Sequence, residues 1–248
     1  MEIQNLSKED ASLILTEFGQ VSTKKLIEII SEIKNGILID IGVYYGCSSK
    51  IMISNSSNNN NKIFGIDPIP FYRTNNSNYT YIQDDSVLVG SNWDKGKVDL
   101  VFFDSVHAKE QVLCELYYWW ELIKEGGYAI FHDTSWDGYI HPEGHSCAGK
   151  KTGNTGLGYD SYGGIEWETP DKAVEDFFKI KINTENRNIN NDCFLLIYED
   201  NNIKVEANYA RLGMTVITKK NNFDYKQNVK NWDNIFQKRE KLLSFFKK

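Results

Sequence analysis

A buried strand that runs directly into a glycine turn constrains this chain more than any other feature. Residues 37–41 are apolar except for Asp40, and two glycines, Gly42 and Gly46, follow them. The pattern predicts a strand buried on both faces, a tight turn, and a helix that begins at Cys47. Such a turn brings backbone N–H groups and a helix N-terminus close to a bound ligand. The glycine pair alone fits an ordinary strand-to-helix turn equally well.

The next predicted strand ends in an acid that fits a ligand-binding role. Residues 62–66 predict a second buried strand, and Asp67 follows it. In dinucleotide-binding folds, a carboxylate about 20 residues past the glycine turn accepts hydrogen bonds from ribose hydroxyls. Because Asp67 lies near that separation from Gly42, we expect it to bind a ribose. The alternative, that Asp67 caps the turn before Pro68, stays open.

Strands alternate with helical stretches over residues 37–133. Further strands are predicted at 79–83, 98–103 and 128–131, with a helix at 108–124 before the last of them. Two final strands are predicted at 193–198 and 214–218, as an antiparallel pair joined by a loop. This order predicts an α/β fold with a Rossmann-like, seven-stranded, mostly parallel sheet, helices on both faces and an antiparallel last strand.

Polar residues stand at the carboxyl ends of the predicted parallel strands. They are Asp67, Asp85, Asp104, His132 and Asp133. Because ligands bind beyond the carboxyl ends of the strands in such sheets, we expect these side chains to form a functional site at one rim. Two acids at neighbouring strand ends repel each other unless a positive group lies between them. This favours a functional role for Asp104 and Asp133 over a role as buried structural acids.

Composition argues against several other classes of function. The formal net charge of −6 disfavours a duplex nucleic-acid partner, since phosphate binding needs a basic surface. No apolar run approaches the roughly 20 residues of a membrane span, and residues 1–5 lack the pattern of a signal peptide. Four scattered cysteines without a Cys-x-x-Cys pair fit reduced thiols. We therefore expect a cytoplasmic protein.

The pattern divides the chain into three parts. Residues 1–36 predict an N-terminal helical segment that packs on the core, residues 37–220 the ligand-binding domain, and residues 221–248 an amphipathic C-terminal tail. The tail is expected to dock on its own domain or on a second subunit, rather than on a membrane surface. A homo-oligomer is therefore left open.

One stretch of the domain, residues 134–169, lacks any sustained periodicity. It is rich in glycine, aromatic residues and histidines, and it predicts a lid over the substrate. Within it, His141, His145 and Cys147 have the spacing of a transition-metal site. A lid that contacts solvent or substrate is the favoured interpretation.

Three motifs, in this order, resemble those of class I S-adenosylmethionine-dependent methyltransferases. Specifically, they resemble the branch of small-molecule and sugar O-methyltransferases that includes metal-assisted members. Residues 40–48 resemble the cofactor loop of that branch, residues 98–107 its fourth-strand motif, and residues 125–134 the strand that closes the site. The likeness covers roughly residues 20–218.

The resemblance implies roles for particular residues. The implied cofactor-binding residues are Asp40, Gly42, Tyr44, Gly46, Ser48, Asp67, Asp85, Ser86 and Asp104. Within this set, Gly42 and Gly46 would line the methionine part, Asp67 would bind the ribose, and Asp85 with Ser86 would lie near the adenine. The sequence departs from the family pattern at Tyr44, where many relatives have a further glycine, and at Ser105 and Val106, which replace a glycine and an acid.

The implied activity is methyl transfer from S-adenosylmethionine to a hydroxyl of a small-molecule acceptor, expected to be a sugar or glycan precursor. Mg²⁺ held by Asp104, Asp133 and His132 is expected to assist. The implied catalytic residues are His132, Asp133 and His107, and a metal-free histidine base is the alternative.

Two rival functions are kept. An NAD-dependent oxidoreductase on a similar fold is disfavoured, because Tyr44 occupies the second glycine position of Gly-x-Gly-x-x-Gly. A non-catalytic, methyltransferase-like binding protein is disfavoured because Gly42, Gly46, Asp67, Asp104 and Asp133 are all present. Phosphoryl and nitrogen acceptors also stay open.

Overall fold

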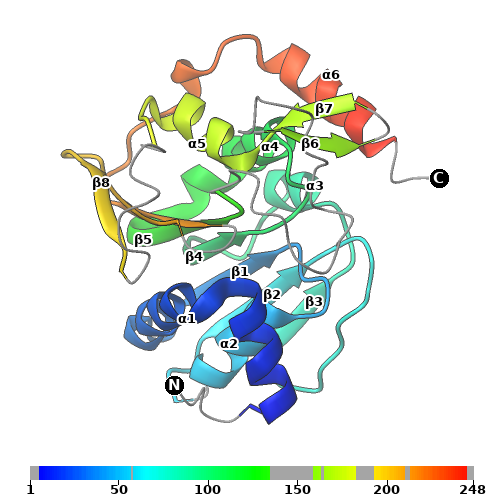
Figure 1. Cartoon of the computed structure of the whole chain (residues 1–248), viewed down its shortest axis with the longest axis vertical. Coiled ribbons are helices and arrows are strands. Elements are labelled where there is room, and N and C mark those ends of the chain that lie inside the picture. The colour runs from blue at the N-terminus through cyan, green and yellow to red at the C-terminus, as the bar shows by residue number, and fades with distance from the viewer. Residues whose placement is uncertain are drawn as a thin grey trace.

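The computed structural model describes residues 6–56, 58–134, 159–162, 165–182, 193–209 and 213–244. One large sheet organises these residues (Figure 1). Its strands, in spatial order, are β3 (Tyr79–Ile82), β2 (Lys62–Ile66), β1 (Ile37–Ile41), β4 (Val98–Phe103), β5 (Ile123–His132), β10 (Met214–Lys219), β9 (Ile203–Asn208) and β8 (Leu195–Glu199). A separate two-stranded sheet pairs β6 (Tyr159–Tyr162) with β7 (Ile165–Glu168).

The first five strands of the main sheet run parallel to one another. Strand β10 joins β5 in the antiparallel direction, and β9 and β8 continue the sheet with antiparallel pairings. The predicted class, a Rossmann-like mostly parallel sheet with antiparallel strands at the end, is confirmed. The carboxyl ends of β1 to β5 consequently share one rim, which we call the carboxyl rim.

The number and pairing of the last strands differ from the prediction. The main sheet has eight strands among the described residues, not seven. The strands predicted at 193–198 and 214–218 do not pair with each other, because β9 lies between them in the sheet. Sequence reasoning treated the stretch that forms β9 as a loop.

Helices cover both faces of the sheet (Figure 1). On one face lie α1 (Lys8–Glu32) and α2 (Cys47–Ser56), and on the other lie α3 (Ser86–Ser91), α4 (Lys109–Leu122) and α5 (Pro170–Phe178). Each face of the sheet has its own hydrophobic core, and successive residues of β1 point to opposite faces. Leu38 packs on the side of α1 and α2, whereas Ile39 and Ile41 pack on the side of α4 and α5. No helix among these described residues is both long and apolar enough to span a membrane.

Helix α1 changes direction at a glycine. Ser7 caps its start by accepting a hydrogen bond from the Asp10 N–H at 3.0 Å. Inside the helix, Gly19 has φ 73° and ψ 167°, a conformation essentially restricted to glycine. The break places Phe18 beside the last residue of β5, where its ring contacts His132.

The C-terminal tail packs on the domain. After a short 3₁₀ turn (Lys226–Asn228), helix α6 (Trp232–Leu243) lies along α4. The Tyr117 ring of α4 contacts Trp232 at 4.8 Å and Phe236 at 5.5 Å between centroids, and Leu242 is fully buried. The apolar face predicted for the tail is thus covered, at least in part, by α4 of the same chain.

Candidate active site

The glycine turn after β1 packs directly against the loop after β4. Gly42 and Gly46 both have positive φ, at +82° and +80°. A Cβ at Gly42 would lie 2.0 Å from the carbonyl oxygen of Asp104, and one at Gly46 would lie 2.5 Å from the ring of Tyr72. Both positions therefore require glycine, because the backbone must approach its neighbours closely.

Three exposed aromatic residues surround this turn. Tyr44 and Tyr45 are about half exposed, as is Phe71 on the loop after β2. The ring centroids of Tyr44 and Tyr45 lie 4.0 Å apart. The centroid of Phe71 lies 5.3 Å from that of Tyr44 and 5.7 Å from that of Tyr45. The side chain of Tyr44, the departure from the glycine pattern, thus points out toward solvent as part of an aromatic group and does not fill the turn.

Asp67 connects the second strand to the glycine turn. Its Oδ2 accepts a hydrogen bond from the Tyr44 N–H at 3.0 Å, and its Oδ1 accepts one from the Ile69 N–H at 2.8 Å. Each carboxylate oxygen has a second lone pair, so the predicted hydrogen bonds from ribose hydroxyls remain available to it. The alternative role of Asp67, as a cap of the turn before Pro68, is present in the structure as the hydrogen bond from the Ile69 N–H.

Asp40 lies buried beneath the turn. The Ser49 hydroxyl donates to its Oδ2, and its Oδ1 has no hydrogen-bond partner among the described residues. Burial raises the pKa of this carboxyl to about 7, although Ser49 and Ser48 oppose the shift. Asp40 and Ser49 are thus joined under the first turn of α2, in the region where the cofactor loop was predicted.

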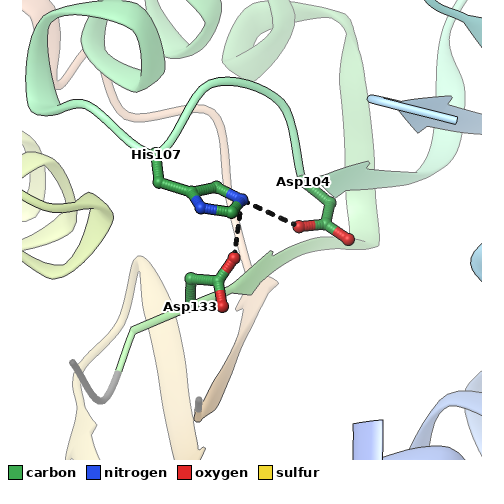
Figure 2. A group of neighbouring side chains, drawn as sticks. All are labelled: Asp104, His107 and Asp133. Carbon is green, nitrogen blue, oxygen red and sulfur yellow. Dashed lines mark ion pairs between the residues drawn. The ribbon is translucent and has the colours of Figure 1, made fainter. Parts of the chain in front are cut away.

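Three side chains converge at the carboxyl rim, as Figure 2 shows. The Nε2 of His107 lies 2.7 Å from Oδ2 of Asp133 and 3.6 Å from Oδ1 of Asp104. One ligand atom from each residue falls within 4.8 Å of the others. We call these residues and His132 the rim cluster. Asp104 follows β4, His107 precedes α4, His132 is the last residue of β5 and Asp133 follows it, so neighbouring strand ends of the fold supply the cluster.

His132 lies between the two carboxylates. Its Nδ1 is 3.2 Å from Oδ1 of Asp104 and 3.4 Å from Oδ2 of Asp133, and the edge-on ring of Phe18 packs against it at 4.8 Å. Burial lowers the pKa of His132, but the Asp133 and Asp104 carboxylates raise it more, so that it lies well above its usual value. His132 therefore provides the positive group that two adjacent acids need.

Asp133 is the most constrained member of the rim cluster. It is 1% exposed, has a φ of 57°, and its Oδ1 has no hydrogen-bond partner among the described residues. Burial raises the pKa of Asp133, but the imidazoles of His107 and His132 outweigh it and hold the pKa well below its usual range. A buried oxygen without a partner, beside a second carboxylate and an imidazole, fits a cation ligand.

Two histidines stand beside the two carboxylates. Sequence reasoning named His132 as the third metal ligand, which stays a prediction, and the Nδ1 of His132 lies beside both acids. The ligand atoms of Asp104, His107 and Asp133 also gather in one group. His107, predicted as a catalytic residue, is thus also a candidate ligand.

Glu17 of α1 is a site residue that sequence reasoning missed. It lies two residues before the break at Gly19 and interacts electrostatically with Asp104, Asp133 and both histidines of the rim cluster. Burial and then the Asp104 carboxylate raise its pKa. The one available signal was an acid just before a glycine inside a helical pattern, which is weak.

The predicted adenine-side residues have structural partners. Asp85 caps α3 by accepting from the Val87 and Leu88 N–H groups, and it also pairs with Arg239 of α6. Ser86 donates to Oε1 of Glu115 at 2.6 Å. Their predicted contact with the adenine stays a prediction. Most of the lid, including His141, His145 and Cys147, lies outside the described residues.

A family comparison identifies the segment that carries this geometry. Residues 39–134 match a family model described as a methyltransferase domain. The match begins in β1 and ends one residue past Asp133, so it contains the glycine turn and the whole rim cluster. This segment is therefore similar to a methyltransferase domain. No curated protein matches the chain in sequence.

Solved structures agree on the fold. A candidate caffeoyl-CoA O-methyltransferase of Staphylococcus aureus is similar with a TM-score of 0.53 at 14% identity, over 87% of this chain and 93% of that one. A candidate rRNA methylase of Clostridium thermocellum gives 0.50 at 15%, over 82% and 98%. The MycE methyltransferase of the mycinamycin biosynthetic pathway, in complex with Mg and SAH, gives 0.50 at 16%, over 85% and 53%. At these identities the likeness shows the fold.

Proposed function

We propose that the chain transfers the methyl group of S-adenosylmethionine to a hydroxyl oxygen of a small molecule, with a sugar or glycan precursor as the acceptor and a divalent metal as assistant. One observation carries the proposal. The space that a Cβ would take at Gly42 is filled by the carbonyl oxygen of Asp104, 2.0 Å away. A ligand that binds at the glycine turn would therefore lie beside the carboxylates of the rim cluster. Their negative charge would stabilise the positively charged sulfonium of S-adenosylmethionine.

The cofactor would be held from several strand ends. The turn from Gly42 to Gly46 presents backbone to the ligand, and Asp67, fixed by the Tyr44 N–H, keeps lone pairs for the ribose hydroxyls. The loop at Asp85 and Ser86 lies at the same rim, on the side where the adenine would bind. The fold precedent for such a ligand is MycE, whose structure holds SAH.

The chain must also align the acceptor and take its proton. Sulfonium methyl transfer needs an oxygen placed in line with the methyl group and a group that accepts the hydroxyl proton. His107 lies between Asp133 and Asp104 and would accept that proton, and the two carboxylates would stabilise the imidazolium that forms. His132 would keep the carboxylates oriented.

The same three donors could hold a divalent cation. Asp104 and Asp133 would provide oxygens and His107 a nitrogen, and the Oδ1 of Asp133 would gain the partner that it lacks. A bound cation would lower the pKa of an acceptor hydroxyl that it coordinates. The Mg in the MycE structure supports a metal on this fold.

The acceptor class is supported by the surface around the glycine turn. Tyr44, Tyr45 and Phe71 present half-exposed rings at the glycine turn and on the loop after β2. Aromatic faces pack well on the apolar faces of sugar rings. Transfer of labelled methyl groups to a panel of sugars, nucleotide sugars and phenols tests this. Labelling of phenols alone would contradict the sugar assignment.

Metal assistance has a separate test. We expect EDTA to abolish methyl transfer and Mg²⁺ to restore it, and we expect Asp133→Asn and Asp104→Asn to reduce the rate by about 100-fold or more, because each removes a donor and a charge. Asp94→Asn, which alters an exposed acid that forms an ion pair with the adjacent Lys95, serves as the control. Full activity in EDTA together with an active Asp133→Asn enzyme would exclude the metal and leave the histidine base.

A further inference from the structure

We infer that Arg239, on the C-terminal helix α6, is a positioning residue for the cofactor site. The inference rests on the proposed function, because it concerns the affinity of the carboxyl rim for the cofactor. Arg239 is 3% exposed although it lies near the end of the chain, and its guanidinium contacts two parts of the domain.

The first contact is with the loop after β3. The Nη2 of Arg239 pairs with Oδ2 of Asp85, whose other oxygen caps α3. Asp85 is thus fixed through both carboxylate oxygens. This loop stands at the carboxyl rim, next to the loop of Asp67 in the order of the sheet.

The second contact leads to the loop after β4. The Nε of Arg239 donates to Oε1 of Gln111 at 2.8 Å, and Nε2 of Gln111 donates to Oε1 of Glu115 at 2.8 Å. The same Glu115 oxygen accepts hydrogen bonds from Ser86 at 2.6 Å and from Ser105 at 2.7 Å. Ser105 is the residue after Asp104.

This chain of contacts ends at the glycine turn. The Cα of Ser105 would lie 2.8 Å from a Cβ at Gly42, which shows how closely the two loops touch. Three side chains, Arg239, Gln111 and Glu115, therefore connect the C-terminal helix to both loops and, through them, to the turn.

Burial makes the arrangement sensitive to the loss of any one partner. Glu115 is fully buried, burial raises its pKa, and its Oε2 has no hydrogen-bond partner among the described residues. Gln111 is 3% exposed. Because unpaired buried polar groups are costly, removal of Arg239 should make the two loops rearrange to find other partners. The positions of the two loops would change, whereas the packing of α6 through its aromatic residues would not.

Calorimetric titration with S-adenosylhomocysteine tests the inference. We expect Arg239→Met to weaken binding by about tenfold or more, the loss expected for a buried charged hydrogen bond. Arg239→Lys should also weaken it, since one ammonium cannot reach Gln111 and Asp85 in the same geometry as a planar fork. Lys238→Met is the matched control, because this neighbouring side chain of the same helix pairs, within the part of the chain that the structure describes, only with Glu110, at 3.4 Å. Its affinity should stay within about twofold of wild type.

A second variant separates positioning from stability. Asp85→Asn, added to Arg239→Met, removes the carboxylate left unpaired and should restore much of the lost melting temperature. Asp85→Asn alone gives the reference affinity, because Asp85 is itself a predicted cofactor-binding residue. Under our inference the double variant binds S-adenosylhomocysteine more weakly than Asp85→Asn does, because it also lacks the contact of Arg239 with Gln111. Recovery of affinity together with stability, or equal loss in Arg239→Met and Lys238→Met, would overturn the inference. Failure of the wild-type chain to bind S-adenosylhomocysteine would instead contradict the proposed function.

Discussion

At the scale of residues, the rim cluster balances its charge with imidazoles. The ion pairs that Asp104 and Asp133 form among the described residues are all with His107 and His132. Imidazole is the side chain whose charge changes near neutral pH. The charge that balances the two carboxylates can therefore change with pH, which a lysine or arginine partner would not allow near neutrality. A divalent cation would supply the same balance at higher pH.

Asp40 gives a pH prediction at this scale. Its pKa is raised to about 7 by burial, so between about pH 4 and 7 the folded chain keeps a proton that the unfolded chain has lost. The stability contributed by that proton is complete at low pH and is lost as the pH rises through 7. Asp40→Asn should therefore raise the melting temperature at pH 8, by about 5 °C or more, and change it little at pH 4.5.

Thermal unfolding of both proteins at the two pH values measures this difference. Asp84→Asn, which alters an exposed acid, is the control. Asp99→Asn is unsuitable, because Asp99 forms an ion pair with Lys124. An equal shift of Asp40→Asn at both pH values would show that Asp40 does not titrate in this window.

The residues that the sequence predicted well are those placed by strands. Asp104, His132 and Asp133 were found because each follows a strongly apolar strand, and parallel strands bring their ends together. Arg239 was not predicted from the sequence, because its partner Asp85 is 154 residues away and no periodicity relates the two residues. Glu17 was missed for the same reason, since only tertiary packing of α1 brings it to the rim.

At the scale of elements, the break in α1 determines what reaches the site. Gly19 ends the first part of the helix, and Phe18 just before it packs on His132 and Phe102. A continuous helix would carry Glu17 and Phe18 along a straight axis and away from at least one of these partners.

Replacement of Gly19 tests this element. Gly19→Ala forces a Cβ into a backbone conformation essentially restricted to glycine, so we expect a loss of about 1–3 kcal/mol in the free energy of unfolding. The melting temperature should fall by roughly 3–10 °C. Gln20→Ala, at the exposed helical position next to it, should change the melting temperature by about 1 °C or less. An unchanged melting temperature for Gly19→Ala would show that α1 tolerates a continuous path.

Strand β9 shows why the last part of the sheet was predicted incompletely. Its buried apolar residues Ile203, Val205 and Ala207 alternate with Lys204 and Glu206, which is a strand signal of period two. The signal is short and follows a polar stretch, so it resembled a loop. Which strand lies next to β5 depends on non-local pairing, which no local pattern specifies.

At the scale of the whole molecule, helices α1 and α6 both contribute side chains to the surroundings of the same rim. The N-terminal helix contributes Glu17 to the surroundings of the rim cluster, and the C-terminal helix contributes Arg239 to the loops beside it. Residues of the segments predicted as 1–36 and 221–248 therefore interact with the rim cluster or with the loops beside it. This predicts that removal of either segment impairs cofactor binding as well as stability.

Calorimetric titration of the wild-type chain with S-adenosylhomocysteine, beside a fluorescence titration with NADH, tests the central claim most directly. We predict that S-adenosylhomocysteine binds and NADH does not. Gly42→Ala should weaken binding by about tenfold or more, because its Cβ displaces the loop of Asp104. Gly96→Ala, at a glycine with a similar positive φ but open space around it, should not. Binding of NADH without S-adenosylhomocysteine would favour the oxidoreductase, and an absence of binding to S-adenosylhomocysteine would contradict the account.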